Sequence, residues 1–119
     1  MRVMVLVKAT RDSERGFEPT PDAMESLAAM GRFNDELRAA GIFMMAEGLL
    51  PSAEGKRIAF DGADRTVIDG PFTPAEELVA GFWLWDVASM DEAVAWVKRC
   101  PNPMPGPSVI EIRPLHQLA

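Results

Sequence analysis

The chain has 119 residues, of which 25% are charged, and a formal net charge of -6. This length fills one hydrophobic core, so we expect a single domain over residues 1–119. The negative charge argues against nucleic acid and anionic membranes as partners. The only cysteine, Cys100, excludes an intrachain disulfide and predicts a reducing, cytoplasmic location. The apolar run 3–7 is too short for a signal peptide, and no stretch is long enough to span a membrane.

The first half of the chain predicts a strand, a helix and a second strand. Residues 2–9 are β-branched and apolar on both faces, which is typical of a central strand. Residues 10–20 are polar and predict a loop. Thr20 and Pro21 are an N-cap and a first helical position, so a helix is expected from there to about Ala40. Residues 42–49 predict the second strand, with Glu47 on the same face as Phe43 and Met45 in a largely buried strand.

A hairpin follows, in which 56–60 and 65–68 flank the turn Asp61-Gly62-Ala63-Asp64. This hairpin is polar enough to project from the sheet edge. The strand must end near Ile68, because Asp69-Gly70-Pro71 favours a turn over any regular element.

The stretch 79–87 (VAGFWLWDV) predicts the most apolar strand. Phe82 and Leu84 point to one face, whereas Trp83, Trp85 and Val87 point to the other. Both faces should therefore be covered. Residues 90–100 predict a second helix with Val94 and Val97 inward, and 108–113 a last strand that ends at Pro114 near an edge. The first helix should bury one apolar stripe, formed by Ala23, Leu27, Met30, Phe33, Leu37 and Ala40.

The element order is strand, helix, strand, hairpin, strand, helix, strand. This order predicts an α+β fold of the ferredoxin-like, split βαβ type with an inserted β-hairpin. Two helices cover only one face of such a sheet. We therefore expect a second subunit to cover the other face, through an isologous two-fold interface that makes a homodimer.

Asp69-Gly70-Pro71-Phe72 is followed by Glu77-Leu78 and by Gly81-Phe82-Trp83. This order resembles the DGPF, or YCII-related, family of small bacterial proteins. Further matches are Glu47-Gly48-Leu49, Asp91-Glu92-Ala93, Trp96 and Cys100-Pro101-Asn102-Pro103. The resemblance runs from about residue 2 to residue 114, and it implies a ferredoxin-like chain that dimerises into an α+β barrel. Most members have no established activity.

Two family features do not carry over to this chain. The family often has a lysine where Glu76 stands, and some relatives carry a His-Asp pair thought to be catalytic, whereas this chain has only His116. No cofactor is expected, because phosphate-cradling glycine loops are absent. No metal site is expected either, because His116 lacks a neighbouring Cys or His.

Two carboxylates are candidate catalytic groups. Glu47 follows an apolar run, and burial would raise its pKa and suit it to general acid–base chemistry. Asp69 lies at the turn and would face a cleft. Each also has a structural interpretation: Glu47 as a bonded residue at a strand end, and Asp69 as the residue that shapes the turn. Candidate ligand-binding residues are Lys8, Gly70, Pro71, Phe72 and Trp83.

The ligand-binding candidates have simpler interpretations too. Lys8 would bind an anion, pair with Glu47 or be solvated, and Trp83 would line a pocket or belong to the core or dimer interface. Three functions follow. The first is a domain that binds a small organic molecule in a cleft of the dimeric barrel. The second is a cofactor-free enzyme of the isomerase or lyase type that uses Glu47 and Asp69 as acid and base, an analogy at the level of fold. The third is a structural or sigma-factor-associated dimerisation module.

Overall fold

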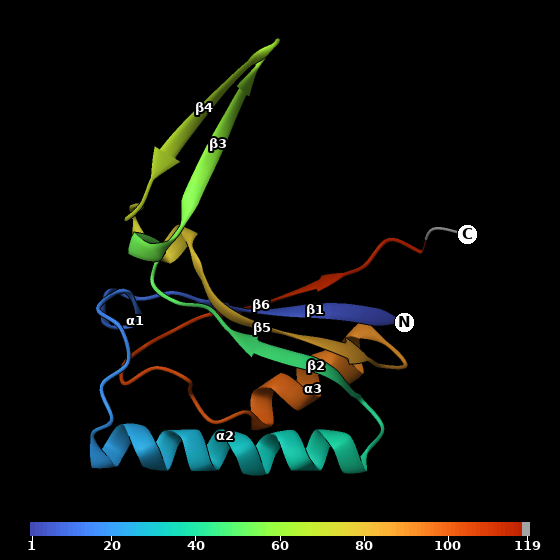
Figure 1. Cartoon of the computed structure of the whole chain (residues 1–119). Helices are drawn as coiled ribbons and strands as arrows, with labels where there is room; N and C mark the ends of the chain where they lie inside the picture. The colour runs from blue at the N-terminus through green and yellow to red at the C-terminus, as the bar shows by residue number, and fades with distance from the viewer. Residues whose placement is uncertain (118–119) are drawn as a thin grey trace.

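The computed structural model describes residues 1–117. Its centre is a four-stranded antiparallel sheet in the order β2-β5-β1-β6, with two long helices on one face (Figure 1). The sheet strands are β1 (Arg2–Lys8), β2 (Phe43–Gly48), β5 (Val79–Asp86) and β6 (Ile110–Pro114). The long helices are α2 (Pro21–Ala39) and α3 (Met90–Arg99). This strand order is that of a ferredoxin-like fold, so the predicted α+β class is confirmed.

The remaining elements are short or lie outside this sheet. Strands β3 (Lys56–Asp61) and β4 (Asp64–Asp69) form a separate two-stranded hairpin. It rises from the side of the sheet that the helices leave open, as Figure 1 shows. The remaining elements are one short α-helix, α1 (Arg11–Glu14), and two 3₁₀ turns, η1 (Ser52–Glu54) and η2 (Ala75–Glu77). No helix described in residues 1–117 is both long and apolar enough to cross a membrane.

Local sequence determines where the long helices begin and end. The Thr20 side chain accepts a hydrogen bond from the Ala23 N–H at 3.1 Å, and the Ser89 side chain accepts one from the Glu92 N–H at 3.2 Å. Each bond satisfies an amide that the first helical turn leaves free. Gly41 follows α2 with a φ of +75°, a conformation that side chains other than glycine rarely adopt. Both predicted helices are therefore confirmed.

The core lies between the helices and one face of the sheet. Trp85 and Leu37 are fully buried there. The ring centres of Phe33 and Trp83 lie 6.1 Å apart in an edge-to-face arrangement. The Trp83 Nε1 donates a hydrogen bond to Asn34 Oδ1 at 2.8 Å. Sheet residues of this face are Val3, Val5, Val7, Trp83 and Trp85. The predicted division of β5 into two faces is thus confirmed.

Three expectations about local structure were wrong. Residues 11–14 form a short helix instead of a loop, because Thr10 and Ser13 make reciprocal capping bonds. Leu27 is 53% exposed, since α2 extends beyond the edge of the core at its first half. Val94 is 37% exposed, and Trp96 packs against the core from α3.

A β-bulge changes the faces of β2. Phe43 lies opposite Trp85, but Met45 lies opposite Leu84, so the register shifts between them. Phe43 therefore faces the helices, whereas Met45 and Glu47 face the other way. The expectation that Glu47 shares a face with Phe43 was wrong, because strict alternation does not hold across the extra residue.

Candidate functional site

The turn Asp69–Phe72 lies at the base of the hairpin and is closely packed against the segment after β2. The Gly70 N–H donates a hydrogen bond to the Gly55 carbonyl at 3.0 Å. A Cβ atom at Gly70 would lie 1.8 Å from the Ser52 carbonyl oxygen. Only glycine fits this close approach of two backbones.

Ser52 joins the turn to the short helix α1. Its hydroxyl accepts a hydrogen bond from the Phe72 N–H at 2.9 Å and donates one to the Glu14 carboxylate. The same carboxylate accepts the Ser52 N–H at 3.0 Å. We call Glu14, Ser52, Asp69, Gly70 and Phe72 the turn cluster. No local sequence pattern marks Glu14 or Ser52 as its members, because the two residues lie 38 positions apart.

The hairpin engages both outer residues of the turn. The Lys56 ammonium pairs with the Asp69 carboxylate, whose side chain is 73% exposed. The Arg57 guanidinium lies 4.0 Å from the centre of the Phe72 ring. Asp69 therefore lies at the surface and holds the hairpin base, and Pro71 beside it is exposed as well.

Glu47 lies on a different part of the molecule. It is exposed on β2, and the expectation of a largely buried strand was wrong because β2 is an edge of the sheet. Its opposite residue is Phe82, which is followed across the sheet by Leu6 and then Glu111. Within residues 1–117, no hydrogen bond or ion pair involves the Glu47 carboxylate.

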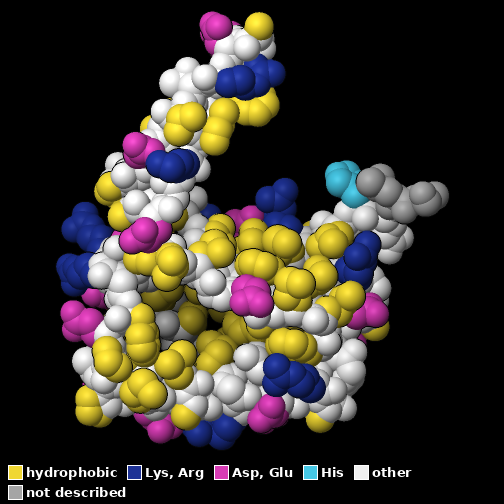
Figure 2. Space-filling view, in the orientation of Figure 1, with side chains coloured by type: hydrophobic (Ala, Val, Ile, Leu, Met, Phe, Trp, Pro, Cys, Tyr) yellow, Lys and Arg dark blue, Asp and Glu magenta, His cyan; other side chains and the backbone are white. Residues whose placement is uncertain are grey.

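This side of the sheet is uncovered and apolar at its centre, and Figure 2 shows hydrophobic side chains gathered over the sheet and along the hairpin. The apolar side chains on the sheet are half-buried or exposed, so each still presents surface to solvent. We call this surface the open face. Its members follow from the strand register and from the alternation of β1: Arg2, Met4, Leu6, Lys8, Met45, Glu47, Phe82, Leu84, Asp86, Glu111 and Arg113.

The other two candidate ligand residues lie outside the turn. Trp83 is only 4% exposed and packs in the core, which matches its structural interpretation. Lys8 ends β1, and its backbone N–H donates to the Val109 carbonyl at 3.0 Å. Among the described residues, no ion pair joins Lys8 to Glu47. The structure therefore brings Asp69, Gly70, Pro71 and Phe72 together at the turn and places Trp83 in the core. Glu47 and Lys8 both lie on the open face of the sheet, on the edge strand β2 and at the end of β1.

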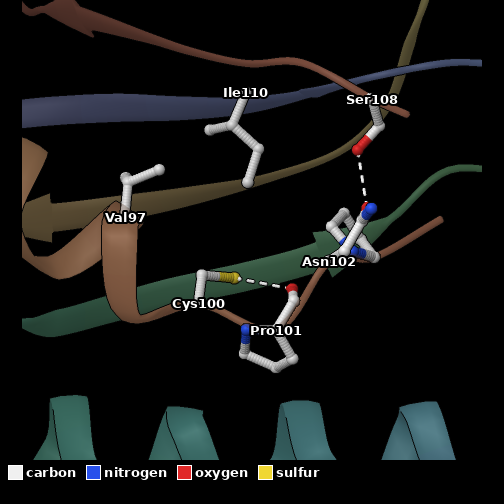
Figure 3. A pocket seen from close by; sticks show the side chains of 7 residues that line it. Val97, Cys100, Pro101, Asn102, Ser108 and Ile110 are labelled. Carbon is white, nitrogen blue, oxygen red and sulfur yellow. Dashed lines mark hydrogen bonds between the residues drawn. The ribbon is translucent and has the colours of Figure 1, made fainter. Parts of the chain in front are cut away.

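A pocket of about 210 Å³ lies between the end of α3, the proline-rich loop and β6 (Figure 3). The Cys100 thiol donates a hydrogen bond to the Pro101 carbonyl at 3.2 Å, and Asn102 Oδ1 accepts one from Ser108. None of the candidate residues lines this pocket. Within residues 1–117, no three His, Cys, Asp or Glu side chains are grouped to hold a metal ion.

Burial raises the pKa of the Cys100 thiol to about 11. At pH 8 the folded chain should hold about 100-fold less thiolate than an unfolded chain, whose thiol keeps the ordinary value. Because the thiolate is the reactive form, alkylation by iodoacetamide should be slowed by a similar factor. Rates measured with and without denaturant check this expectation, and equal rates would contradict it. The raised pKa also means that this thiol stabilises the fold below pH 9, and that the contribution is lost as the pH rises through about 11.

Ser52→Ala should lower the free energy of unfolding by about 1–3 kcal/mol, because it removes the partner of the Phe72 N–H and one donor to Glu14. Urea denaturation measures the change. Ser108→Ala is the matched control, since its hydroxyl bonds Asn102 at 2.6 Å in an exposed loop. A Ser52→Ala change no larger than that of Ser108→Ala would contradict the structural role of the turn cluster.

Comparison with known proteins identifies the family. The model of the YCII-related domain matches residues 1–118. An uncharacterised protein of Rhizobium meliloti (strain 1021), R00369, is 34% identical over 67 residues, which are 56% of this chain and 54% of that protein. The chain thus spans about half the length of this curated relative.

Among solved structures, the chain is similar to 5-chloro-2-hydroxyhydroquinone dehydrochlorinase from Burkholderia phenoliruptrix AC1100, in complex with 2,5-dihydroxybenzoquinone. The two are 15% identical with a TM-score of 0.45, over 93% of this chain and 91% of that one. The match of the family model over nearly all of the sequence is the stronger finding. The chain belongs to the YCII-related family.

Proposed function

We propose that this chain binds a small organic molecule at the open face, inside a homodimer with the architecture of an α+β barrel. The observation that carries the proposal is Glu47, an exposed carboxylate that lies opposite Phe82 on the apolar centre of the sheet surface. Ligand sites combine apolar walls with a few polar groups that fix orientation. A molecule with an apolar body and a hydrogen-bond donor suits this combination.

The homodimer supplies the second wall of the site. Within one chain no helix covers the open face, because α2 and α3 both lie on the other side of the sheet (Figure 1). A two-fold axis would place two open faces against each other, so that each covers the apolar surface of the other. The single cysteine is consistent with the reducing cytoplasm as the place where this dimer works.

Acid–base turnover of the bound molecule is the second candidate function. The Glu47 carboxylate is free of protein partners in the part of the chain described, so it is available to accept a proton from a ligand. Asp69 is less suited to this chemistry, because Lys56 already holds its carboxylate. Glu47 is therefore the main candidate for the group that transfers the proton.

Native mass spectrometry of protein purified gently from its own host tests the proposal. We expect twice the 13.0 kDa mass of the chain together with the added mass of a small molecule. A dimer without added mass, and without a thermal shift against a panel of metabolites, would contradict ligand binding. That result would favour a structural or sigma-factor-associated dimerisation module.

Glu47→Gln separates binding from turnover. If the carboxylate holds a donor of the ligand, the variant should keep its dimer mass and lose most of the added mass. If it transfers a proton, the variant should keep the ligand and fail to convert it. Glu25→Gln is the matched control, because Glu25 is an exposed carboxylate that pairs with Arg32 on the surface of α2. An unchanged ligand mass and unchanged turnover in Glu47→Gln would exclude both roles.

A further inference from the structure

The hairpin β3–β4 is an apolar arm without a partner in its own chain. Every residue of both strands is exposed, and neither strand packs extensively against another element described in residues 1–117. Two-stranded hairpins are at best marginally stable alone in water. This arm nevertheless exposes large apolar side chains, with Phe60 72% and Val67 61% exposed.

One face of the hairpin concentrates these side chains. Ile58 lies opposite Val67, and Phe60 lies opposite Arg65, so all four project from the same face. The Arg65 guanidinium stacks 4.3 Å from the centre of the Phe60 ring. We call Ile58, Phe60 and Val67 the arm face. Ile68, which is 44% exposed, lies opposite Arg57 on the other face.

The base of the arm is held firmly against the body. Gly70 bonds Gly55, and Ser52 bonds the Phe72 N–H, at the point where the hairpin leaves the sheet. Arg57 adds its contact with the Phe72 ring. These contacts direct the arm away from the helices, on the side of the open face (Figure 1). Hydrophobic side chains therefore extend from the open face onto the arm (Figure 2).

We propose that the arm face packs against the body of a second copy of this chain and clasps it onto the open face. This inference rests on the proposed homodimer and names the element that holds it together. Both uncovered apolar surfaces belong to every copy, so a two-fold axis that pairs the open faces would also present each arm to the other copy. Because the arm projects on the side of the open face, a second copy bound to that face would lie next to the arm.

The area of the surfaces supports the role of the arm. Four strands spaced about 4.8 Å apart, with five to eight residues each, give the open face roughly 400 Å². Two such faces bury about 800 Å², which is only as large as many crystal contacts. By the same estimate one face of the hairpin covers about 200 Å², and each arm buries as much again on the copy that it contacts. Counted on both surfaces, the total is about 1,600 Å², which is the size of a typical stable interface.

Sedimentation equilibrium over a dilution series tests the clasp. Phe60→Ser should raise the dissociation constant of the dimer by at least about 30-fold, because Phe60 is the largest apolar side chain of the arm face and buried aromatic side chains often dominate such contacts. Val67→Ser combined with Phe60→Ser should give folded monomer at micromolar concentration. Ile68→Ser is the matched control on the other face, and it should leave the dissociation constant within about threefold of wild type.

The outcomes separate this inference from the dimer on which it rests. Wild type that is monomeric would contradict the homodimer itself. If Leu84→Asp on the open face dissociates the dimer but the arm variants do not, the open face is the interface and the clasp is wrong. If Ile68→Ser weakens the dimer as much as Phe60→Ser, the assigned face of the arm is wrong. Circular dichroism shows in each case that the variant is folded.

Discussion

Gly70→Ala is expected to lower the free energy of unfolding by at least about 3 kcal/mol. The new Cβ atom would lie 1.8 Å from the Ser52 carbonyl oxygen and 2.7 Å from its carbonyl carbon. Both atoms belong to the backbone, so neither can move away as the end of a flexible side chain would. The turn cluster must therefore separate, and overpacking of this kind is strongly destabilising. Urea denaturation at one protein concentration measures the loss.

Gly31→Ala is the control for this substitution. Gly31 lies exposed in the middle of α2, and a Cβ atom there would meet nothing within 4 Å. Because alanine is the better helix former, this variant should gain about 0.5–1 kcal/mol. The two substitutions add the same methyl group with opposite expected signs. A Gly70→Ala variant as stable as wild type would show that Ser52 does not lie against the turn.

Trp85→Ala should cost about 3–5 kcal/mol, the largest effect that we expect in the core. Trp85 is fully buried and lies 5.7 Å from Trp83 and 6.3 Å from Phe33, measured between ring centres. Removal of its ring leaves a cavity in the centre of this aromatic group. Denaturant unfolding followed by circular dichroism gives the change in free energy.

Replacement of Trp83 or Trp85 by phenylalanine tests the contribution of each indole N–H group. The buried Trp85 Nε1 has no hydrogen-bond partner among the described residues, whereas Trp83 Nε1 donates to Asn34. Trp83→Phe should therefore cost about 1 kcal/mol more than Trp85→Phe, because only the first loses a hydrogen bond. The reverse order would mean that Trp85 Nε1 has a partner.

Much of the fold was predictable because its signals are local. Capping residues such as Thr20 mark the helix starts, and Asp61-Gly62-Ala63-Asp64 marks the hairpin turn. The two faces of β5 follow from simple alternation. These patterns predicted the element order, and with it the sheet topology.

The arrangement of the site was less predictable because it depends on contacts between distant segments. The bonds of Ser52 to Glu14 join residues 38 positions apart, and no local pattern marks such a pair. No residue in the apolar run 42–46 marks the bulge after Phe43. The bulge nevertheless places Glu47 on the opposite face of the sheet from Phe43. The pairing of Asp69 with Lys56 depends on the register of the hairpin. Sequence identified the turn, but not the residues that hold it.

The molar mass in solution tests the central claim most directly, since both the proposed binding site and the clasp require a second copy over the open face. Light scattering of the wild-type protein at micromolar concentration should give twice 13.0 kDa, and Leu84→Asp should give a folded chain of 13.0 kDa. A wild-type mass of 13.0 kDa at that concentration would contradict the account, because the open face and the arm would then be exposed to water.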